Sequence, residues 1–265
     1  MCRILAKTKD MPREKWLELR KQGIGGSDAG AVCGVNPYSS PMKVFQDKTG
    51  DETEEIDNEA VRQGNDLEDY VAQRFMEATG KKVRRSNVMY CNEEYPFMLA
   101  DVDRLVIGED AGLECKTVSA YNEDKWKNGE IPLHYILQCY HYMAVTGKKV
   151  WYLAAFILGR EFICKKLVWD DELIGSLIEA EKSFWHNNIV PRIMPEPDGS
   201  EVCDAVLGQY FHTTRKESEI ALEGFDEKLG RREKILAQIE KLEQEKRKIE
   251  QEVKLFMKDY EYADS

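Results

Sequence analysis

The sequence predicts an α/β domain with a mixed central sheet, followed by a helical segment in the C-terminal part. Helical and strand-like stretches alternate irregularly over the first 195 residues, which favours a mixed sheet over a regular strand–helix repeat. The composition is globular, because 42% of the 265 residues are hydrophobic and can fill a sizeable core. Beyond residue 216 the pattern changes to a heptad repeat, which is typical of a coiled-coil helix.

The N-terminal third is expected to be mainly helical. Trp16 and Leu19 fall on one face of the first helix, and the stretch GIGGSDAGAVCG forms a turn in which Ser27 or Asp28 caps the next helix. An apolar period of about 3.6 residues marks a long helix closed by Gly80. These helices are expected over residues 12–22, from about residue 29, through residue 46 and over residues 59–79, with an acidic loop at 51–57.

Strands dominate the middle of the chain. The expected strands cover residues 83–90, 98–107 and 113–118, and the expected helices cover 133–145 and 170–185. The turn GEDAG joins the second and third strands. KVWYLAAFIL and FICKKLVW form a hairpin, in which Trp151, Tyr152 and Phe156 are expected in the core. Asp170 or Asp171 is expected to cap the second helix.

The C-terminal part separates into a linker and a helix. The Pro-rich stretch VPRIMPEPDGSE predicts a linker over residues 196–215, which leaves a domain at 1–195 and a helical, coiled-coil-like segment at 216–265. Spacings of four and three residues alternate along a heptad seam with one polar member: Ile235, Ile239, Leu242, Lys246, Ile249, Val253 and Phe256. An isolated helix is marginal in water, so this seam is open to pairing with its own chain, another copy or a partner.

Composition argues against several classes of protein. The net charge of −11 disfavours a simple basic coat on nucleic acid, but it allows an enzyme that holds cations at an acidic centre. The seven cysteines are scattered without a CxxC pair, so we expect reduced thiols in a cytoplasm and no iron–sulfur or structural zinc site. No apolar run reaches membrane-spanning length and no secretory signal is evident, so we expect no membrane association.

The stretch LADVDRLVIGEDAGLECKT places two acids and a lysine in a strand-like, apolar setting. Alternate side chains of a strand share a face, so Glu114 and Lys116 point the same way, and the turn returns them to the side of Asp103. Two carboxylates there can hold Mg²⁺ or Mn²⁺, and Lys116 can orient or help to deprotonate a water. The alternative is a strand pair with a surface salt bridge, although apolar neighbours make unpaired charges costly.

The segment VDRLVIGEDAGLECKT resembles the D-x(n)-E-x-K core of the PD-(D/E)XK nucleases, with Val102 in place of the proline. The wider pattern is similar to the YqaJ-like viral recombinase, or lambda exonuclease, family over roughly residues 12–200. The segments that carry this resemblance are WLELRKQGIGGSDAGAVCGVNPYSSPMKVFQDKTG, RQGNDLEDYVAQRFMEATG, FMLADVDRLV, GLECKT and LQCYHYMAVTGKKVWYLAAF.

The resemblance implies a restriction-endonuclease-like core and an activity. The expected protein is a processive, Mg²⁺-dependent 5′-to-3′ exonuclease on double-stranded DNA ends, of phage or prophage recombination, with Mn²⁺ as a possible substitute metal. It leaves 3′ single-stranded overhangs for a single-strand annealing protein. The resemblance also implies a ring-shaped homotrimer that works in the cytoplasm of a bacterial host cell.

Individual residues take roles from the same resemblance. The implied catalytic residues are Asp103, Glu114, Lys116, Glu68 and Gln138, of which Asp103, Glu114 and Glu68 hold the metal. Arg20 and Ser27 match positions that bind the DNA 5′-phosphate, and an Arg beside a Ser at a glycine turn is a reasonable anion site. Asp101 departs from the pattern, because relatives commonly have a small neutral residue there that touches the phosphate.

Alternatives and bland interpretations remain for several features. A structure-specific or Cas4-like endonuclease of the same fold is one rival, although the Cas4 group holds an iron–sulfur cluster with cysteines that this chain lacks. A non-catalytic DNA-end or protein-binding module is the other, although Asp103, Glu114 and Lys116 are all present. His134 and His141 are expected to be ordinary polar positions, and the basic stretch KKVRR is either a phosphate contact or a solvated strand edge.

Overall fold

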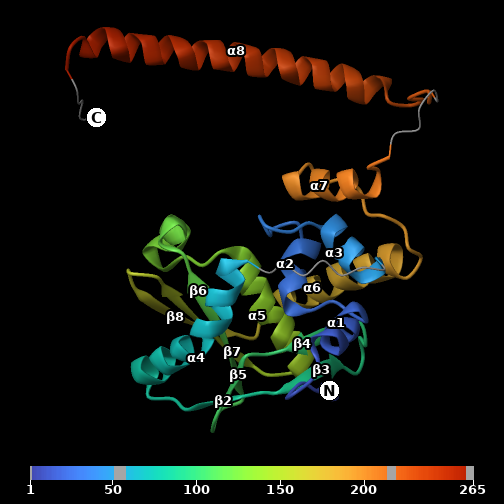
Figure 1. The fold of residues 1–265 in the computed structure, drawn as a ribbon, viewed down its shortest axis with the longest axis vertical. Coiled ribbons are helices and arrows are strands. Elements are labelled where there is room, and N and C mark those ends of the chain that lie inside the picture. The colour runs from blue at the N-terminus through green and yellow to red at the C-terminus, as the bar shows by residue number, and fades with distance from the viewer. Residues whose placement is uncertain (1, 51–57, 214–218, 261–265) are drawn as a thin grey trace. The chain divides into compact units, whose positions relative to one another are not determined.

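The computed structural model describes residues 2–50, 58–213 and 219–260. It divides into two units, residues 1–212 and 213–265, and each is described by itself. The acidic loop expected at 51–57 lies outside the described residues, as do the first and last few residues of the predicted C-terminal segment. Figure 1 labels the helices and strands.

A five-stranded mixed sheet forms the centre of the first unit, with the strand order β2-β5-β6-β7-β8 (Figure 1). Its strands are β2 (Val83–Arg85), β5 (Arg104–Val106), β6 (Ala111–Val118), β7 (Val150–Ile157) and β8 (Phe162–Val168). β6 and β7 pair parallel, and the other neighbours pair antiparallel. The predicted mixed sheet, the turn between β5 and β6 and the β7–β8 hairpin are thereby confirmed.

A second, three-stranded antiparallel sheet corrects the strand predictions. It has the order β1-β3-β4, with β1 at Cys2–Lys7, β3 at Val88–Asn92 and β4 at Leu99–Asp101. The strand predicted over 83–90 breaks where Asn87 takes a positive φ of 54°, so β2 and β3 enter different sheets. The strand predicted over 98–107 also breaks, between β4 and β5, which enter different sheets. This second break leaves Asp103 between the two sheets, outside any ladder.

Two helices cover opposite faces of the central sheet. Trp151 and Leu153 on β7 belong to the core beneath α5 (Leu133–Thr146), whereas Tyr152 and Ala154 belong to the core beneath α4 (Glu59–Thr79). This alternation follows from the two-residue period of a strand. Trp151 is completely buried, as predicted. α4 also ends as predicted, at Gly80 with a φ of 70°.

The remaining helices of this unit are short. They are α1 (Arg13–Lys21), α2 (Gly26–Val32), α3 (Pro41–Thr49), the 3₁₀ helix η1 (Ala120–Gly129), α6 (Asp171–Phe184), the π-helical turn η2 (Trp185–Ile189) and α7 (Glu201–Tyr210). Asp170 caps α6 as predicted, because its side chain accepts a hydrogen bond from the Leu173 amide. The sequence predicts neither β1 nor η1.

α7 lies where the sequence predicts a linker. Ser200 caps it by accepting a hydrogen bond from the Cys203 amide at 3.1 Å. Cys203 and Val206 are buried against Met42 of α3, so this stretch is a packed part of the first unit. The sequence does not reveal this helix, because a proline-rich stretch precedes it. Only two of its side chains are buried, so its apolar period is weak. The domain boundary at residue 195 stays a prediction.

The second unit contains α8 (Asp226–Met257), a single helix of 32 residues. The heptad pattern predicts this helix, and within 226–257 no side chain is buried. Among the residues that the structure describes, no helix is long and apolar enough to cross a membrane.

Gly112 on β6 provides a test of the packing beneath the site. A Cβ atom at this position would lie 2.4 Å from the buried indole ring of Trp151. We expect Gly112→Ala to lower the free energy of unfolding by about 1–3 kcal/mol, because the core cannot expand to accept it. Gly175→Ala on α6 is the matched control, since no described atom lies within 4 Å of its Cβ. Chemical denaturation should show this control to be stabilised by about 1 kcal/mol, and equal behaviour of the two variants would contradict the packing.

Candidate active site

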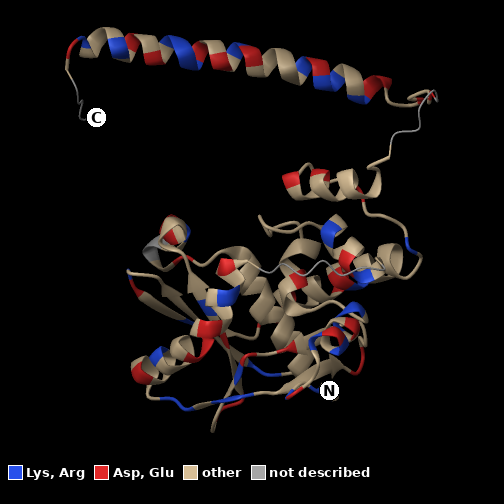
Figure 2. Cartoon of the chain, in the orientation of Figure 1, with Lys and Arg blue, Asp and Glu red and all other residues tan. Residues whose placement is uncertain are grey.

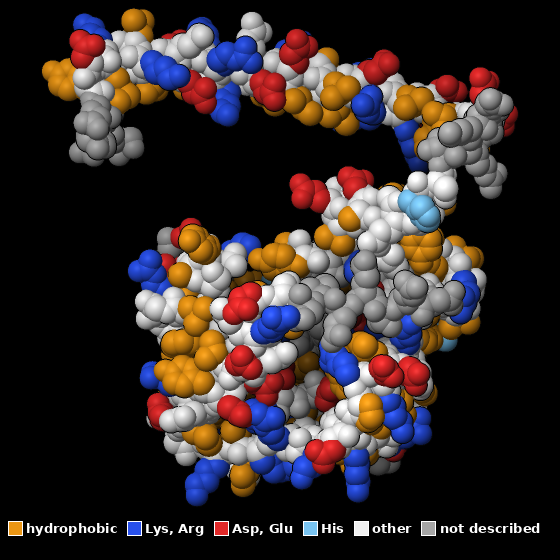
Figure 3. All heavy atoms as spheres, in the orientation of Figure 1, with side chains coloured by type: hydrophobic (Ala, Val, Ile, Leu, Met, Phe, Trp, Pro, Cys, Tyr) orange, Lys and Arg blue, Asp and Glu red, His pale blue; other side chains and the backbone are white. Residues whose placement is uncertain are grey.

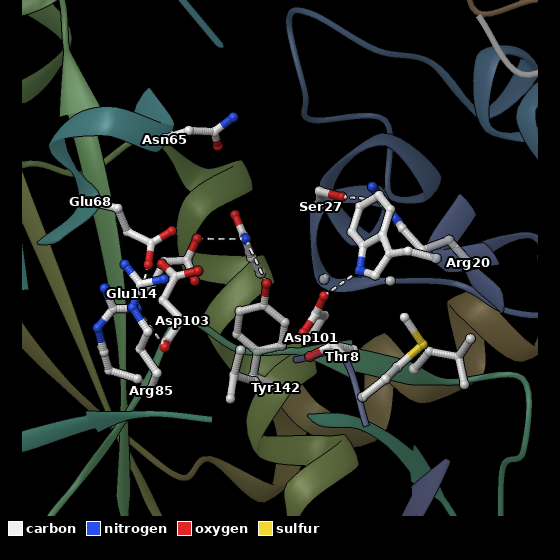
Figure 4. A pocket seen from close by; sticks show the side chains of 18 of the residues that line it. Thr8, Arg20, Ser27, Asn65, Glu68, Arg85, Asp101, Asp103, Glu114 and Tyr142 are labelled. Carbon is white, nitrogen blue, oxygen red and sulfur yellow. Dashed lines mark hydrogen bonds and ion pairs between the residues drawn. The ribbon is translucent and has the colours of Figure 1, made fainter. Parts of the chain in front are cut away.

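One cavity of about 430 Å³ gathers the site residues that the sequence predicts. Its walls come from α1, α2, α4, α5, β4 and β6 and from the segment between β4 and β5. The predicted residues that line it are Arg20, Ser27, Glu68, Asp101, Asp103, Glu114, Lys116 and Gln138. Figure 4 shows Glu68, Asp103 and Glu114 on one side of the cavity and Arg20 and Ser27 on the other, with Tyr142 between them.

The acidic side of the cavity is built on the β5–β6 hairpin. Oδ2 of Asp103 accepts a hydrogen bond from the Cys115 amide at 2.8 Å, which ties the loop before β5 to β6. Glu114 is 2% exposed. Its Oε1 lies 2.7 Å from Nζ of Lys116 and 2.7 Å from Nε2 of Gln138 on α5. The convergence that strand alternation predicts is therefore present in the structure.

Glu68 reaches this centre from α4 through an arginine that sequence reasoning missed. Arg104 is 4% exposed, and its guanidinium bridges the carboxylates of Glu68 and Asp69. Asp69 also pairs with Arg85 at 2.6 Å, so part of the basic KKVRR stretch is ion-paired. Lys81 of the same stretch pairs with Glu109. The available signal for Arg104 was its place in a predicted strand directly after Asp103.

Burial and like charges shift the proton affinities of these groups. Burial raises the pKa of Asp103 well above its ordinary value, and the neighbouring carboxylates of Glu114 and Glu68 raise it further. Burial alone would lower the pKa of Lys116, but Glu114 and Asp103 raise it above its ordinary value. Lys116 is therefore a protonated ammonium that donates to Glu114. In this state it cannot act as a base.

The carboxylates fit a divalent cation. Oε2 of Glu114 is buried without a hydrogen-bond partner among the described residues, and an unsatisfied buried carboxylate oxygen is costly. Mg²⁺ and Mn²⁺ prefer such hard oxygen ligands and keep several waters, so two or three carboxylates suffice. Within the described residues, no three His, Cys, Asp or Glu side chains already form a metal cage. Oε1 of Glu68 is paired with Arg104, which leaves its other oxygen to join the two carboxylates.

The opposite side of the cavity is a glycine turn followed by α2. The Arg20 guanidinium donates to Oγ of Ser27 at 2.8 Å. α2 begins at Gly26, earlier than predicted, and neither Ser27 nor Asp28 is its N-cap residue. Asp28 lies in the first turn, where it accepts from the Gly25 amide at 2.8 Å and pairs with the nearly buried Lys48 at 2.7 Å.

Asp101 is engaged by a tryptophan that sequence reasoning did not assign to the site. Nε1 of Trp16 donates to Oδ2 of Asp101 at 2.6 Å. The Arg13 and Arg20 guanidinium groups lie 4.2 and 4.8 Å from the centre of the Trp16 ring. Burial raises the pKa of Asp101, against the opposing effects of the Trp16 hydrogen bond and of Arg20. Trp16 thus contacts both the Asp101 carboxylate and the Arg20 guanidinium in the wall of the cavity.

α5 contacts three parts of the site. Tyr142 accepts a hydrogen bond from Gln138 at 2.9 Å and packs so closely on Gly26 that a Cβ there would lie 2.5 Å from its ring. His141, completely buried, lies 2.8 Å from Glu181 of α6 and 2.8 Å from the Leu99 carbonyl of β4. His141 is therefore a structural group. His134 lies apart from it and packs on aromatic rings.

Comparison with known proteins assigns the chain to a family. Residues 15–149 match the model of the YqaJ-like viral recombinase domain. The chain is also 40% identical over 264 residues to the uncharacterized protein YqaJ of Bacillus subtilis strain 168, a match that covers 98% of this chain and 83% of that protein. The chain belongs to the YqaJ-like viral recombinase family.

Solved structures confirm the restriction-endonuclease-like core. The alkaline exonuclease LHK-Exo of Laribacter hongkongensis superposes with a TM-score of 0.58 at 20% identity, covering 68% of this chain and 94% of that chain. A putative exonuclease of Eubacterium rectale gives 0.52 at 14% identity, covering 82% of this chain and 98% of that chain. At these identities the likeness establishes the fold.

The Asp28–Lys48 pair should carry part of the stability of the glycine turn. Burial alone would raise the pKa of Asp28, but Lys48 and Arg20 lower it to about 2. We expect Lys48→Met to cost about 3 kcal/mol at pH 7, because it leaves Asp28 buried without its main partner. Lys43→Met on the same helix is the control, since Lys43 pairs with the half-exposed Asp47 and should cost under about 1 kcal/mol.

The pH dependence gives this prediction its sign. The folded pKa of Asp28 is lower than the unfolded one, so its stabilising contribution is complete above pH 3.8 and is lost as the pH falls toward about 2. Urea denaturation between pH 7 and pH 2.5 should show the gap between wild type and Lys48→Met closing in that window. A constant gap down to the lowest pH would disprove the assignment.

Proposed function

We propose that this protein is a divalent-metal-dependent 5′-to-3′ exonuclease that degrades one strand of linear double-stranded DNA and leaves 3′ overhangs. One observation carries the proposal: Asp103, Glu114, Lys116, Glu68 and Gln138 share a single cavity with Arg20 and Ser27. An acidic centre opposite an arginine and a hydroxyl that can bind a terminal phosphate is what end-dependent hydrolysis of a phosphodiester requires. Membership of a viral recombinase family supports a role in phage-type recombination.

The acidic side would carry the cleavage chemistry. Asp103, Glu114 and Glu68 would hold Mg²⁺ or Mn²⁺, which when bound makes water a better nucleophile and offsets charge on the phosphate. Gln138 holds Oε1 of Glu114 in place at 2.7 Å. Lys116, kept as an ammonium beside Glu114, stabilises the negative charge that develops on the scissile phosphate and orients the attacking water.

The opposite side would bind the end of the strand. A guanidinium and a hydroxyl that already touch at 2.8 Å can both donate to a 5′-phosphate. Trp16 keeps the Arg20 guanidinium near its ring, so the arginine stays extended toward the cavity. Nε1 of Trp16 also donates to one oxygen of Asp101, which limits repulsion between that carboxylate and the incoming phosphate.

The wider setting follows from the family. We extend the proposal to double-stranded DNA ends as substrate, a single-strand annealing protein as partner, a homotrimeric ring and the cytoplasm of a bacterial host. A Cas4-like endonuclease is disfavoured, because the cysteines of the described residues lie free and form no metal-binding group with His, Asp or Glu. A non-catalytic module is disfavoured by the buried, unpaired oxygen of Glu114.

Digestion of DNA tests the proposed activity. We expect wild-type protein with Mg²⁺ to degrade 5′-phosphorylated linear duplex and to leave closed circular duplex intact. Glu114→Gln and Lys116→Ala should lower the rate by about 10²-fold to 10³-fold, the cost of removing one charge-stabilising group. Glu172→Gln on α6 is the control and should retain the rate, because this carboxylate is exposed and does not line the cavity. Equal cutting of circular and linear DNA would favour the endonuclease. Variants of Glu114 or Lys116 that kept the full rate would refute the assignment of these residues.

Arg20 should set the preference for the phosphorylated end. We expect Arg20→Ala to reduce the ratio of rates on 5′-phosphorylated and 5′-hydroxyl duplex by about 10-fold, in line with one charge-assisted hydrogen bond. Arg160→Ala, at an exposed ion pair with Glu123, is the control and should leave the ratio unchanged. A variant at Arg20 that slows both substrates equally would show a structural role instead.

Metal binding can be measured without activity. Because a ligand of the folded state stabilises it by mass action, millimolar Mg²⁺ or Mn²⁺ should raise the thermal unfolding temperature of wild type. The shift should vanish in Glu114→Gln and persist in Glu172→Gln. An equal shift in both variants would place the bound metal elsewhere.

A further inference from the structure

α8 carries an exposed apolar stripe that the proposed nuclease activity does not use. The heptad seam runs along one side of the helix, and its six apolar members are 39–86% exposed. Figure 3 shows hydrophobic side chains at the surface along α8. A stripe of this length over three heptads is typical of a helix that pairs with another helix. The chemistry of its borders indicates which kind of helix fits.

The borders of the seam are acidic. With Leu242 and Ile249 at position d and Lys246 at position a, the flanking e and g positions between residues 243 and 252 are all glutamates: Glu243, Glu245, Glu250 and Glu252. Apart from Lys246 at the seam, the basic residues around this stretch lie on the outer face, at Lys241, Arg247 and Lys248. Figure 2 shows both signs of charge along α8.

This pattern disfavours a second copy of the same helix. In a parallel pair the g position of one helix faces the e position of the next heptad in the other, so Glu245 would meet Glu250 of the second copy. In an antiparallel pair e faces e and g faces g, so glutamates again meet glutamates. A parallel pair in register would also bring Lys246 against Lys246. Each juxtaposition is repulsive.

We propose that the α8 seam binds an amphipathic helix of a different protein, one whose flanking positions carry lysine or arginine. Such a helix would pair its cations with the four glutamates and would offer a carboxylate to Lys246 at the seam. Two of these glutamates are available, because Glu250 and Glu252 make only long, exposed pairs of 3.7 and 3.8 Å with Lys246 and Lys248. Exposed pairs within one helix contribute little and exchange readily.

Synthetic helices test this proposal on the full-length protein. One three-heptad peptide has isoleucine and leucine in its core, lysine at every e and g position and one glutamate placed to face Lys246. The other has the same core with glutamate at e and g. Fluorescence anisotropy should give an affinity at least about 30-fold higher for the basic peptide, as several charge pairs together imply. Equal affinities, or binding of neither peptide, would overturn the proposal.

Charge reversal on α8 provides the matched comparison. Glu245→Lys/Glu250→Lys changes the border, whereas Glu233→Lys/Glu240→Lys changes the outer face by the same net charge. We expect the border variant to lose about 10-fold in affinity for the basic peptide and the outer-face variant to change less than about 2-fold. Circular dichroism checks that both variants stay helical. Equal losses would reduce the effect to net charge and contradict the seam.

The oligomeric state separates a foreign partner from a second copy. Light scattering of the full chain should give the same mass for wild type and for Ile239→Glu/Val253→Glu, which should no longer bind the basic peptide. A lower mass for this variant would mean that the seam pairs with itself and would refute the proposal. None of these readouts depends on DNA cleavage, so the result is independent of the proposed nuclease activity.

Discussion

The placement of two carboxylates on neighbouring segments of one hairpin is the constraint around which the first unit is organised. Glu114 is buried and Asp103 beside it is half-buried, and two like charges so placed cost free energy unless other groups compensate. A backbone amide, a lysine and a glutamine each meet one of these carboxylate oxygens. Oε2 of Glu114 has no hydrogen-bond partner among the described residues, and the proposed divalent metal would compensate it.

Distance along the chain decides how much the sequence can predict. The triad of Asp103, Glu114 and Lys116 follows from local rules, because strand alternation and one short turn bring the three together. The hydrogen bond between Trp16 and Asp101 joins positions 85 residues apart, and the sequence around either residue does not predict it. The same holds for Arg104 with Glu68 and for His141 with Glu181. Family resemblance supplied Glu68, Gln138, Arg20 and Ser27, which local reasoning alone would have left as ordinary polar residues.

The errors in the fold also have physical causes. The stretches over 83–90 and 98–107 are each predicted as one strand, but the chain changes sheet at Asn87 and again between Asp101 and Arg104. Periodicity records which side chains are buried, and it does not record which neighbour forms the ladder. α7 is not predicted because its burial depends on Met42 of α3. β1 is not predicted because its buried and exposed side chains do not alternate regularly.

Helix α5 contacts the cavity at three points and fixes the distances between them. Gln138 on this helix holds Glu114, Tyr142 packs on the glycine turn beside Ser27, and His141 grips the carbonyl that precedes Asp101 by two residues. A helix is stiff over two turns, so these three attachment points keep a nearly constant separation. In the proposed exonuclease, this fixed separation would set the distance between the bound 5′-phosphate and the carboxylates at the point of cleavage, and it would be the same at each step along a DNA strand.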